Sequence, residues 1–398
     1  MNTVAAPVDA AASPAATQAV RRVRITSIDV MRGLVIVLMM VDHVRERFFY
    51  HILVGDPINL EIVSSTLFFT RLSAHLCAPV FVFLAGLGAW LYANPKPGVT
   101  RSPSYFLFTR GLFLVVLEIV LINQSWFGDI PPETVYLQVI WAIGLSMIAL
   151  SALVYLPYWA IAAIGFLIVF GHNALVPINF APGEFGYTLW TILHDRGVLF
   201  ASDTMTVKIS YPTLPWIGVI LLGYSLGPLY ASTVDAKDRT RKLLQLGAAC
   251  LLLLAVLRGF NIYGETLPWT AGDTTVDTIM SMLNFTKYPP SLDFLLLTLG
   301  ISFLLMSWLD TKNNPVTRVL QTFGQAPMFI YALHLYVLLA SYRLVLATVG
   351  PNEGDLYHIS SVWQIWALTA VLALALYYPT RAFGQYKRKT DKTWVKYF

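Results

Sequence analysis

RITSIDVMRGLVIVLMMVDH, residues 24–43, joins an apolar run long enough to cross a membrane to charged residues at both of its ends. A charge inside a bilayer costs roughly 2.5–3.5 kcal/mol on insertion scales, so such side chains usually face a cavity, a partner or a substrate. On a helix, Asp29 and Arg32 share a face, and His43 lies about three turns further along that face. The pattern predicts one polar stripe that runs from near one membrane surface to near the other, which is the outline of a site that spans the membrane.

The composition indicates that the whole chain lies in a membrane. Of its 398 residues, 57% are hydrophobic and 12% are charged, and the mean hydropathy is +0.63, whereas soluble domains carry about 25% charged residues. We therefore predict an all-α membrane protein, a polytopic bundle of about ten transmembrane helices. The expected spans are 28–48, 76–93, 105–123, 134–154, 157–171, 213–231, 242–260, 291–309, 326–348 and 361–379.

The distribution of basic residues predicts the orientation. Most of the 27 Lys and Arg residues fall in alternate connections and in the C-terminal tail, and by the positive-inside rule these segments are cytoplasmic. Both termini are therefore expected in the cytoplasm. The net charge of +5 follows from this bias and is no argument for nucleic-acid binding. We expect a disordered cytoplasmic tail over 1–23, one membrane domain over 24–380 and a basic cytoplasmic tail over 381–398.

Five stretches, in order along nearly the whole chain, carry a resemblance to a known family. They are 27–33 (SIDVMRG), 75–86 (HLCAPVFVFLAG), 211–224, 287–292 (KYPPSL) and 323–334. With them the chain resembles the bacterial membrane family related to lysosomal heparan-α-glucosaminide N-acetyltransferase, within the wider group of transmembrane acyltransferases. The resemblance implies a helical membrane fold that takes an acyl group from cytosolic acetyl-CoA and delivers it to a sugar on the other side.

The resemblance also implies where transfer takes place. In the lysosomal enzyme an Asn at the end of this first helix and a His soon after it are implicated in transfer. The corresponding region here reads Asp42-His43 and, later, His51. Asp42 stands at the position of the Asn, and the spacing leaves open whether His51 or His43 takes the place of the His.

Acyl transfer from a thioester needs a base for the attacking amine or hydroxyl and donors for the developing oxyanion. We expect His43 to be the base, because the unperturbed pKa of an imidazole near 6.5 suits neutral pH. Asp42 is a candidate for binding the acceptor, and His75, which opens the second predicted span, is a second catalytic group or an orienter. His51 is a further candidate. A structural role at the headgroup level is the alternative for each, and which histidine is the base stays open.

Three residues are expected on the donor side. Arg32 offers a fixed fork of donors to the phosphates or pantetheine of coenzyme A, with Asp29 beside it; a mutual ion pair that only lowers the cost of burial is the alternative. His334 lies deep in the ninth predicted span, where it either lines the donor path or holds helices together.

On the acceptor side, Lys287, just before the eighth predicted span, is a candidate for recognising an anionic acceptor.

Several other chemistries lack support. The chain has no P-loop, no G-x-G-x-x-G, no H-E-x-x-H and no Cys/His cluster with metal-ligand spacing. Its two cysteines, Cys77 and Cys250, lie in separate apolar spans and predict neither a disulfide nor a metal site. No metal is therefore expected.

The pattern favours a multi-pass acyltransferase of the bacterial cytoplasmic (inner) membrane. It would move acetyl from acetyl-CoA to a periplasmic sugar or glycan by general-base activation of the acceptor, with the lipid bilayer and no nucleic acid as its other partner. A transporter or exporter of a small polar solute is the alternative, because buried charges also line translocation routes. The absence of visible repeats counts against it. The acceptor, N- against O-acetylation, a covalent intermediate and the oligomeric state stay open.

Overall fold

The computed structural model describes residues 26–52 and 54–398, so the predicted tail over 1–23 lies outside the described residues. The described chain is mostly helical, with one small sheet. The helices are α1 (Thr26–Phe48), α2 (Ser65–Ser73), α3 (Cys77–Ala93), α4 (Ser104–Leu117), α5 (Asn123–Phe127), α6 (Val139–Leu153), α7 (Tyr158–Gly171), α8 (Tyr187–Leu193), α9 (Leu214–Ser225), α10 (Ala236–Gly259), α11 (Thr275–Met282), α12 (Leu292–Leu309), α13 (Pro315–Gly324), α14 (Pro327–Val349) and α15 (Val362–Lys389), and the strands are β1 (Thr134–Leu137), β2 (Gly197–Ala201) and β3 (Thr206–Ile209).

The length and apolar character of the helices make this a multi-pass membrane protein. Within the described part of the chain, seven helical segments are long and apolar enough to cross a membrane. Helices α6 and α9 are apolar but shorter, and α1 is long enough at 23 residues but carries charges near both ends. The total of ten spans and the cytoplasmic termini stay predictions. The seven segments are Ser65–Ala93, Ser104–Phe127, Tyr158–Leu175, Ala236–Gly259, Leu292–Leu309, Pro327–Val349 and Val362–Lys389.

The second of the predicted spans begins too late. The sequence pattern predicts a start at residue 76, but the helical segment begins at Ser65, where the Ser64 hydroxyl accepts a hydrogen bond from the Leu67 N–H (3.4 Å). A short 3₁₀ turn, Ala74–Leu76, joins α2 to α3 without breaking the segment. Arg71 and His75 therefore lie inside a continuous apolar helical run.

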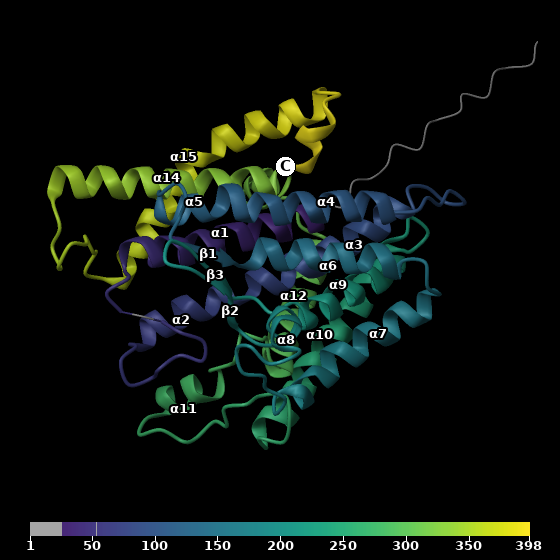
Figure 1. Cartoon of the computed structure of the whole chain (residues 1–398). Helices are drawn as coiled ribbons and strands as arrows, with labels where there is room; N and C mark the ends of the chain where they lie inside the picture. Colours follow the sequence, from purple (N-terminus) through teal and green to yellow (C-terminus); the bar gives the residue numbers. More distant parts are fainter. Residues whose placement is uncertain (1–25, 53) are drawn as a thin grey trace, which may run out of the picture.

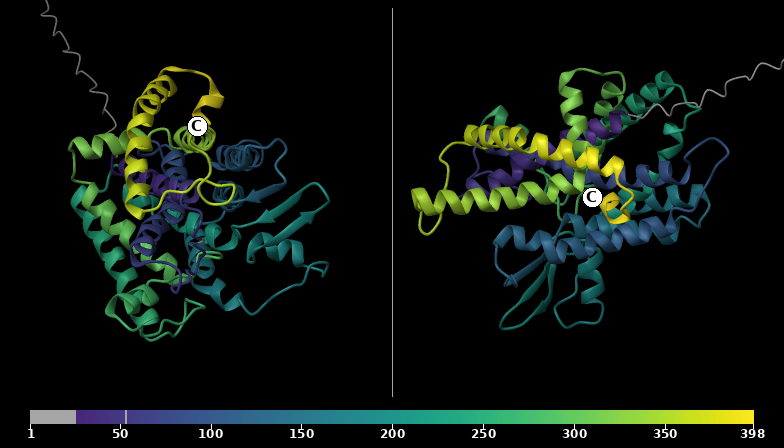
Figure 2. Two further views of the ribbon diagram at one scale, coloured as in Figure 1. Left: turned by 90° about the vertical axis from the view of Figure 1, so that its left-hand side faces the viewer. Right: turned by 90° about the horizontal axis from the view of Figure 1, so that it is seen from above.

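The description as all-α omits a three-stranded sheet with the order β1-β3-β2. The sequence pattern predicts a helical span over 134–154, but residues 134–137 form β1, which pairs in parallel with β3. The cause is local: Asn123 accepts from the Tyr136 N–H (2.7 Å) and donates to the Tyr136 carbonyl (3.0 Å), which holds this β-branched and aromatic stretch extended. Figure 2 shows the β2–β3 hairpin projecting at the edge of the helices.

Helix α1 lies inside the bundle, in contact with α3, α12, α13, α14 and α15 (Figure 1). Its closest neighbour is α13, and two glycines permit that approach. A Cβ on Gly33 would lie 1.8 Å from the Leu320 carbonyl oxygen, and a Cβ on Gly324 would lie 1.8 Å from the Asp29 carbonyl oxygen. The two backbones thus touch directly, which fixes the position of the polar stripe on α1.

We expect Gly33→Ala to destabilise the protein by about 1–3 kcal/mol, because the added methyl group must push α13 away from α1. Thermal unfolding in lipid nanodiscs measures the effect. The matched control is Gly171→Ala in α7, where nothing lies within 4 Å of the added Cβ. Equal melting temperatures for the two variants would contradict the close contact.

Candidate functional site

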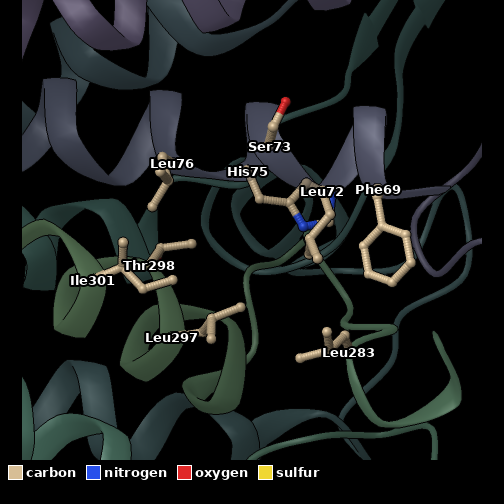
Figure 3. A pocket seen from close by; sticks show the side chains of 9 residues that line it. All are labelled: Phe69, Leu72, Ser73, His75, Leu76, Leu283, Leu297, Thr298 and Ile301. Atoms are coloured by element: carbon tan, nitrogen blue, oxygen red, sulfur yellow. The ribbon is translucent and has the colours of Figure 1, made fainter. Parts of the chain in front are cut away.

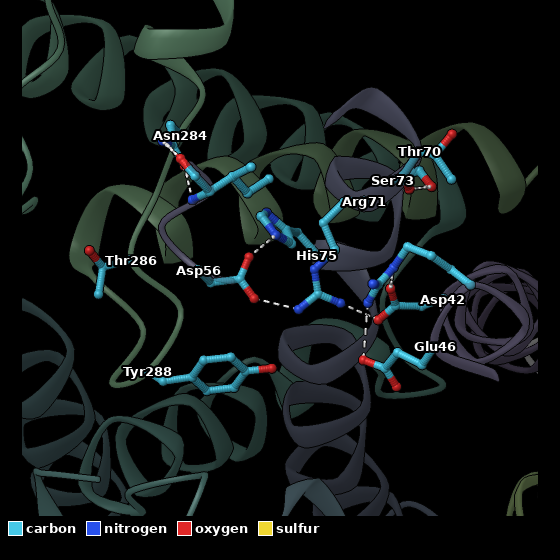
Figure 4. Close-up of polar contacts among 12 residues, drawn as sticks. Asp42, Glu46, Asp56, Thr70, Arg71, Ser73, His75, Asn284, Thr286 and Tyr288 are labelled. Carbon is cyan, nitrogen blue, oxygen red and sulfur yellow. Dashed lines mark hydrogen bonds and ion pairs between the residues drawn. The ribbon is translucent and has the colours of Figure 1, made fainter. Parts of the chain in front are cut away.

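Arg71 lies at the centre of a buried charge network where α1 ends (Figure 4). Its Nη1 donates to Asp42 Oδ2 on α1, and its Nη2 donates to Asp56 Oδ2 in the loop that joins α1 to α2. Arg45 Nε donates to the other Asp42 oxygen at 3.0 Å. The side chains of Arg71 and Arg45 are each 3% exposed. A buried ion pair needs such additional hydrogen bonds to offset desolvation, and here both carboxylates have them.

His75 is the next member of this network. Its Nε2 lies 3.1 Å from Asp56 Oδ1, so it donates to that carboxylate. The other ring nitrogen, Nδ1, is enclosed and has no hydrogen-bond partner among the residues that the structure describes. An imidazole held by a carboxylate on one side, with a lone pair on the other, has the orientation of a general base.

A cavity of about 300 Å³ lies beside His75, between α2, the Ala74–Leu76 turn, Leu283 and α12 (Figure 3). Besides His75, its walls carry only two polar side chains, Ser73 and Thr298. The rest are apolar: Phe69, Leu72, Leu76, Leu283, Leu297 and Ile301. This space suits an apolar group better than a sugar or a phosphate.

A second histidine pair joins α1 to α14. His43 Nδ1 lies 2.7 Å from His334 Nε2, and His334 Nδ1 lies 2.8 Å from the Ile330 carbonyl, to which it must donate. In the neutral pair His334 Nε2 is therefore the acceptor and His43 Nδ1 the donor. This assignment leaves the lone pair of His43 on Nε2. Because His43 is half-buried whereas His334 is fully buried, His43 is the accessible member.

Lys287 places a further cation at this network. Its side chain is buried, and within the described residues its ammonium makes no hydrogen bond; it lies 5.3 Å from the centre of the Tyr288 ring. Desolvation opposes its charge, and so does Arg71, but the neighbouring Tyr288, Asp56 and Asp42 together raise the pKa of Lys287. The ammonium therefore stays charged, and its N–H groups are available to a ligand.

The segment that carries Lys287 is fixed from several sides. Asn284 accepts from the Ile58 N–H (2.7 Å) and donates to the Ile58 carbonyl (2.8 Å), which ties it to the Asp56 loop. The buried Arg258 at the end of α10 donates to four backbone carbonyls of this region, those of Leu267, Ser281, Met282 and Asn284. The polar site therefore combines α1, α2 and two loops that are distant in sequence.

Three of the four residues predicted as catalytic lie at this end of α1. Asp42 belongs to the Arg71 network, His75 joins it through Asp56, and His43 follows Asp42 on the same helix. His51 does not join them; its ring lies 5.0 Å from that of His358. The structure brings these side chains together, while their chemical roles stay predictions.

The residues predicted for the donor side lie in two places. Asp29 and Arg32 form an ion pair at 3.5 Å near the start of α1, and Arg32 Nη2 also donates to the Leu84 carbonyl of α3 (3.2 Å). His334 is not beside them, because it bonds His43 nearer the other end of α1. It therefore connects to the predicted base rather than to the predicted coenzyme A contacts.

Asp56 and Arg71 are not among the residues that the sequence pattern predicts for the site. An arginine inside the apolar helix STLFFTRLS, residues 65–73, is a signal that could have found Arg71, because a charge at such a place needs a buried partner. Asp56 gives no comparable signal. It lies in a loop, and only the folded chain buries its carboxylate, whose side chain is 0% exposed.

We expect Asp56→Asn to destabilise the protein by about 3–5 kcal/mol at neutral pH, because it removes one partner of the buried Arg71. Burial alone would raise the pKa of Asp56, but Arg71 and the hydrogen bond from His75 outweigh it and hold the pKa well below its usual value. The stabilisation is therefore complete above the unfolded-state pKa of about 3.9 and is lost as the pH falls from there through the lower folded-state pKa.

Thermal unfolding of the wild type and Asp56→Asn between pH 7 and pH 3 checks this expectation. The difference between them should be constant near neutral pH and shrink below about pH 4. Asp273→Asn, which changes an exposed carboxylate in the loop after α10, is the matched control. A pH-independent difference would show that the charge of Asp56 does not matter.

Comparison with known protein families gives a match over residues 24–263, to the family described as "Heparan-alpha-glucosaminide N-acetyltransferase, catalytic". A search of curated proteins gave no match. The matched range is more than half of the chain and includes α1 to α10 with the Arg71 network, whereas Lys287 and His334 lie beyond it. The resemblance seen in the short motifs is thereby confirmed. The chain belongs to the heparan-α-glucosaminide N-acetyltransferase catalytic family.

Proposed function

We propose that this protein moves an acetyl group from cytosolic acetyl-CoA to a sugar or glycan on the periplasmic side of the bacterial cytoplasmic membrane. Family membership supports acetyl transfer in a membrane. The observation that carries the proposal is the His43–His334 pair, which leaves an accessible imidazole lone pair next to a buried ammonium and a fixed charge network.

In the proposed reaction His43 is the general base. The acceptor oxygen or nitrogen attacks the acetyl carbonyl carbon, and its proton passes to His43 Nε2. The carbon–sulfur bond then breaks, and the departing coenzyme A thiolate takes that proton from His43, which restores the neutral base. His334 is a positioning residue, because its Nε2 accepts from His43 Nδ1 and so keeps the His43 lone pair on Nε2.

Lys287 is proposed as the donor for the developing oxyanion. Its side chain is buried, its raised pKa keeps the ammonium charged, and the ammonium makes no hydrogen bond to another described side chain, so it can donate without breaking an existing bond. Asp42 is less suited to bind the acceptor than the sequence suggests, because Arg45 and Arg71 already occupy both of its oxygens. We assign it the role of fixing these arginines.

The donor would enter at the other end of α1. Arg32 lies eleven positions before His43, about 16 Å along the helix. We propose that Arg32, paired with Asp29, contacts the phosphates or pantetheine of acetyl-CoA, while the acetyl group reaches the His43 end. This arrangement would let donor and acceptor meet from opposite faces of the membrane.

Purified protein in nanodiscs, given acetyl-labelled coenzyme A and candidate amino sugars or glycans, tests the proposal. Loss of thioester together with label in the acceptor supports it. If acetyl-CoA neither binds nor is consumed, while the protein carries a solute across vesicles, the chain is a transporter and the proposal fails. Binding of acetyl-CoA is measured separately, so an untried acceptor is not mistaken for an absent activity.

His43→Ala should lower kcat by about a hundredfold to ten-thousandfold, because it removes the base. His334→Ala should lower kcat less and leave the KM for acetyl-CoA unchanged, since it removes only the group that fixes the His43 tautomer. The control is His194→Asn, a change in a histidine that bonds His172 and Asp195. An unchanged kcat in His43→Ala would remove His43 from the mechanism.

Lys287→Met should lower kcat by about a hundredfold to a thousandfold with little change in the KM for acetyl-CoA, since it removes a donor that acts on the transition state. Lys287→Arg should restore part of the rate by keeping the charge. Steady-state kinetics with varied acceptor distinguishes the roles: a raised acceptor KM with an unchanged kcat would assign Lys287 to acceptor recognition instead.

A further inference from the structure

His51, Glu353 and His358 form a cluster apart from the network around Arg71. Each of the three offers one ligand atom, and these atoms all lie within 4.8 Å of one another. His51 follows the end of α1, whereas Glu353 and His358 lie in the connection between α14 and α15. Two imidazoles and a carboxylate converge here from segments at opposite ends of the sequence.

Backbone hydrogen bonds hold the connection between α14 and α15 against the end of α1. The Ile359 N–H donates to the Phe48 carbonyl at 2.9 Å. The Asn352 side chain accepts from the His358 N–H (2.8 Å) and donates to the His358 carbonyl (2.7 Å). His358 is therefore fixed by its backbone, and its ring lies 5.0 Å from that of His51.

His358 has an unused nitrogen. The residue is 8% exposed, and its Nδ1 is enclosed without a hydrogen-bond partner among the described residues. A buried polar atom left unpaired costs free energy, so such an atom needs an explanation such as a bound ion.

We propose that His51, Glu353 and His358 bind one Zn²⁺ ion, with water in the fourth position. Imidazole ligands favour zinc and its neighbours over Mg²⁺ or Ca²⁺, which prefer oxygen ligands. A tetrahedral site with zinc–nitrogen bonds near 2.0–2.1 Å separates ligand atoms by about 3.4 Å. The side chains of His51 and Glu353 are exposed and free to close that distance, while His358 stays fixed.

This site could not be predicted from the sequence, because its two histidines lie far apart and have no local ligand spacing. An ion here would tie the connection between α14 and α15 to His51, which follows the end of α1 and lies eight positions beyond His43. It would thus hold the end of the helix that carries the proposed base. The ion takes no part in the proposed acetyl transfer, so the two proposals stand or fall separately.

Zinc titration of the tag-free full chain in nanodiscs, with a competing fluorescent chelator, tests the site. We expect one Zn²⁺ per chain. His51→Ala, Glu353→Gln and His358→Ala should each weaken binding by about 10–100-fold or more, since even loss of an outer-shell partner has this effect on a metal site. Asp355→Asn, an exposed carboxylate in the same connection, is the matched control and should not change binding.

A second readout is the visible spectrum of bound Co²⁺, which reports tetrahedral nitrogen and oxygen ligands and should be lost in His51→Ala. Because His51 is exposed, this variant keeps the proposal testable even where His358→Ala misfolds. Equal Zn²⁺ affinity in the wild type and in the His51→Ala, Glu353→Gln double variant would overturn the proposal, as would the absence of stoichiometric binding.

Discussion

The arrangement of the site depends on one buried guanidinium, that of Arg71. Its two terminal nitrogens bind Asp42 on α1 and Asp56 in the following loop, so a single rigid fork fixes the helix and the loop relative to each other. Removing Arg71 would leave the buried Asp56 with only His75 as a hydrogen-bond partner among the described residues, and removing either carboxylate would leave Arg71 with one partner in place of two. Breaking a buried ion pair in this way costs far more than the pair contributes by itself. The same Asp56 holds His75, so the orientation of that imidazole also depends on Arg71.

Much of the fold follows from local sequence patterns, whereas the departure at residues 134–137 depends on a contact between two elements. The apolar segments predicted the long helices because burial of a 20-residue apolar helix in lipid needs no distant partner. Residues 134–137 are equally apolar, but Asn123 satisfies the backbone of Tyr136 and holds it as a strand. A pairing of this kind depends on a side chain from another element, which hydropathy does not register.

The candidate site was predictable only where its residues share one helix. Asp42 and His43 stand out because polar side chains at the end of an apolar helix are costly, and the structure places both at the Arg71 end of the bundle. His334 stood out for the same reason, yet its contact with His43 joins α1 to α14 and could not be read from spacing. Asp56 could be identified only from the folded loop that buries it. His51 and His358 could be identified only from the packing of the connections that carry them.

The distribution of hydrogen bonds separates residues that hold the site from one that is free to act. Asp42 is shared by Arg45 and Arg71, and Asp56 is shared by Arg71 and His75, so both carboxylates are satisfied within the protein. Lys287 belongs to the same electrostatic group but has no hydrogen-bond partner among the described residues. A buried cation whose N–H groups make no hydrogen bond is stabilised further by an incoming anion or oxyanion. The charge balance of the network therefore favours Lys287, more than any of its arginines, as the cation that acts on a ligand.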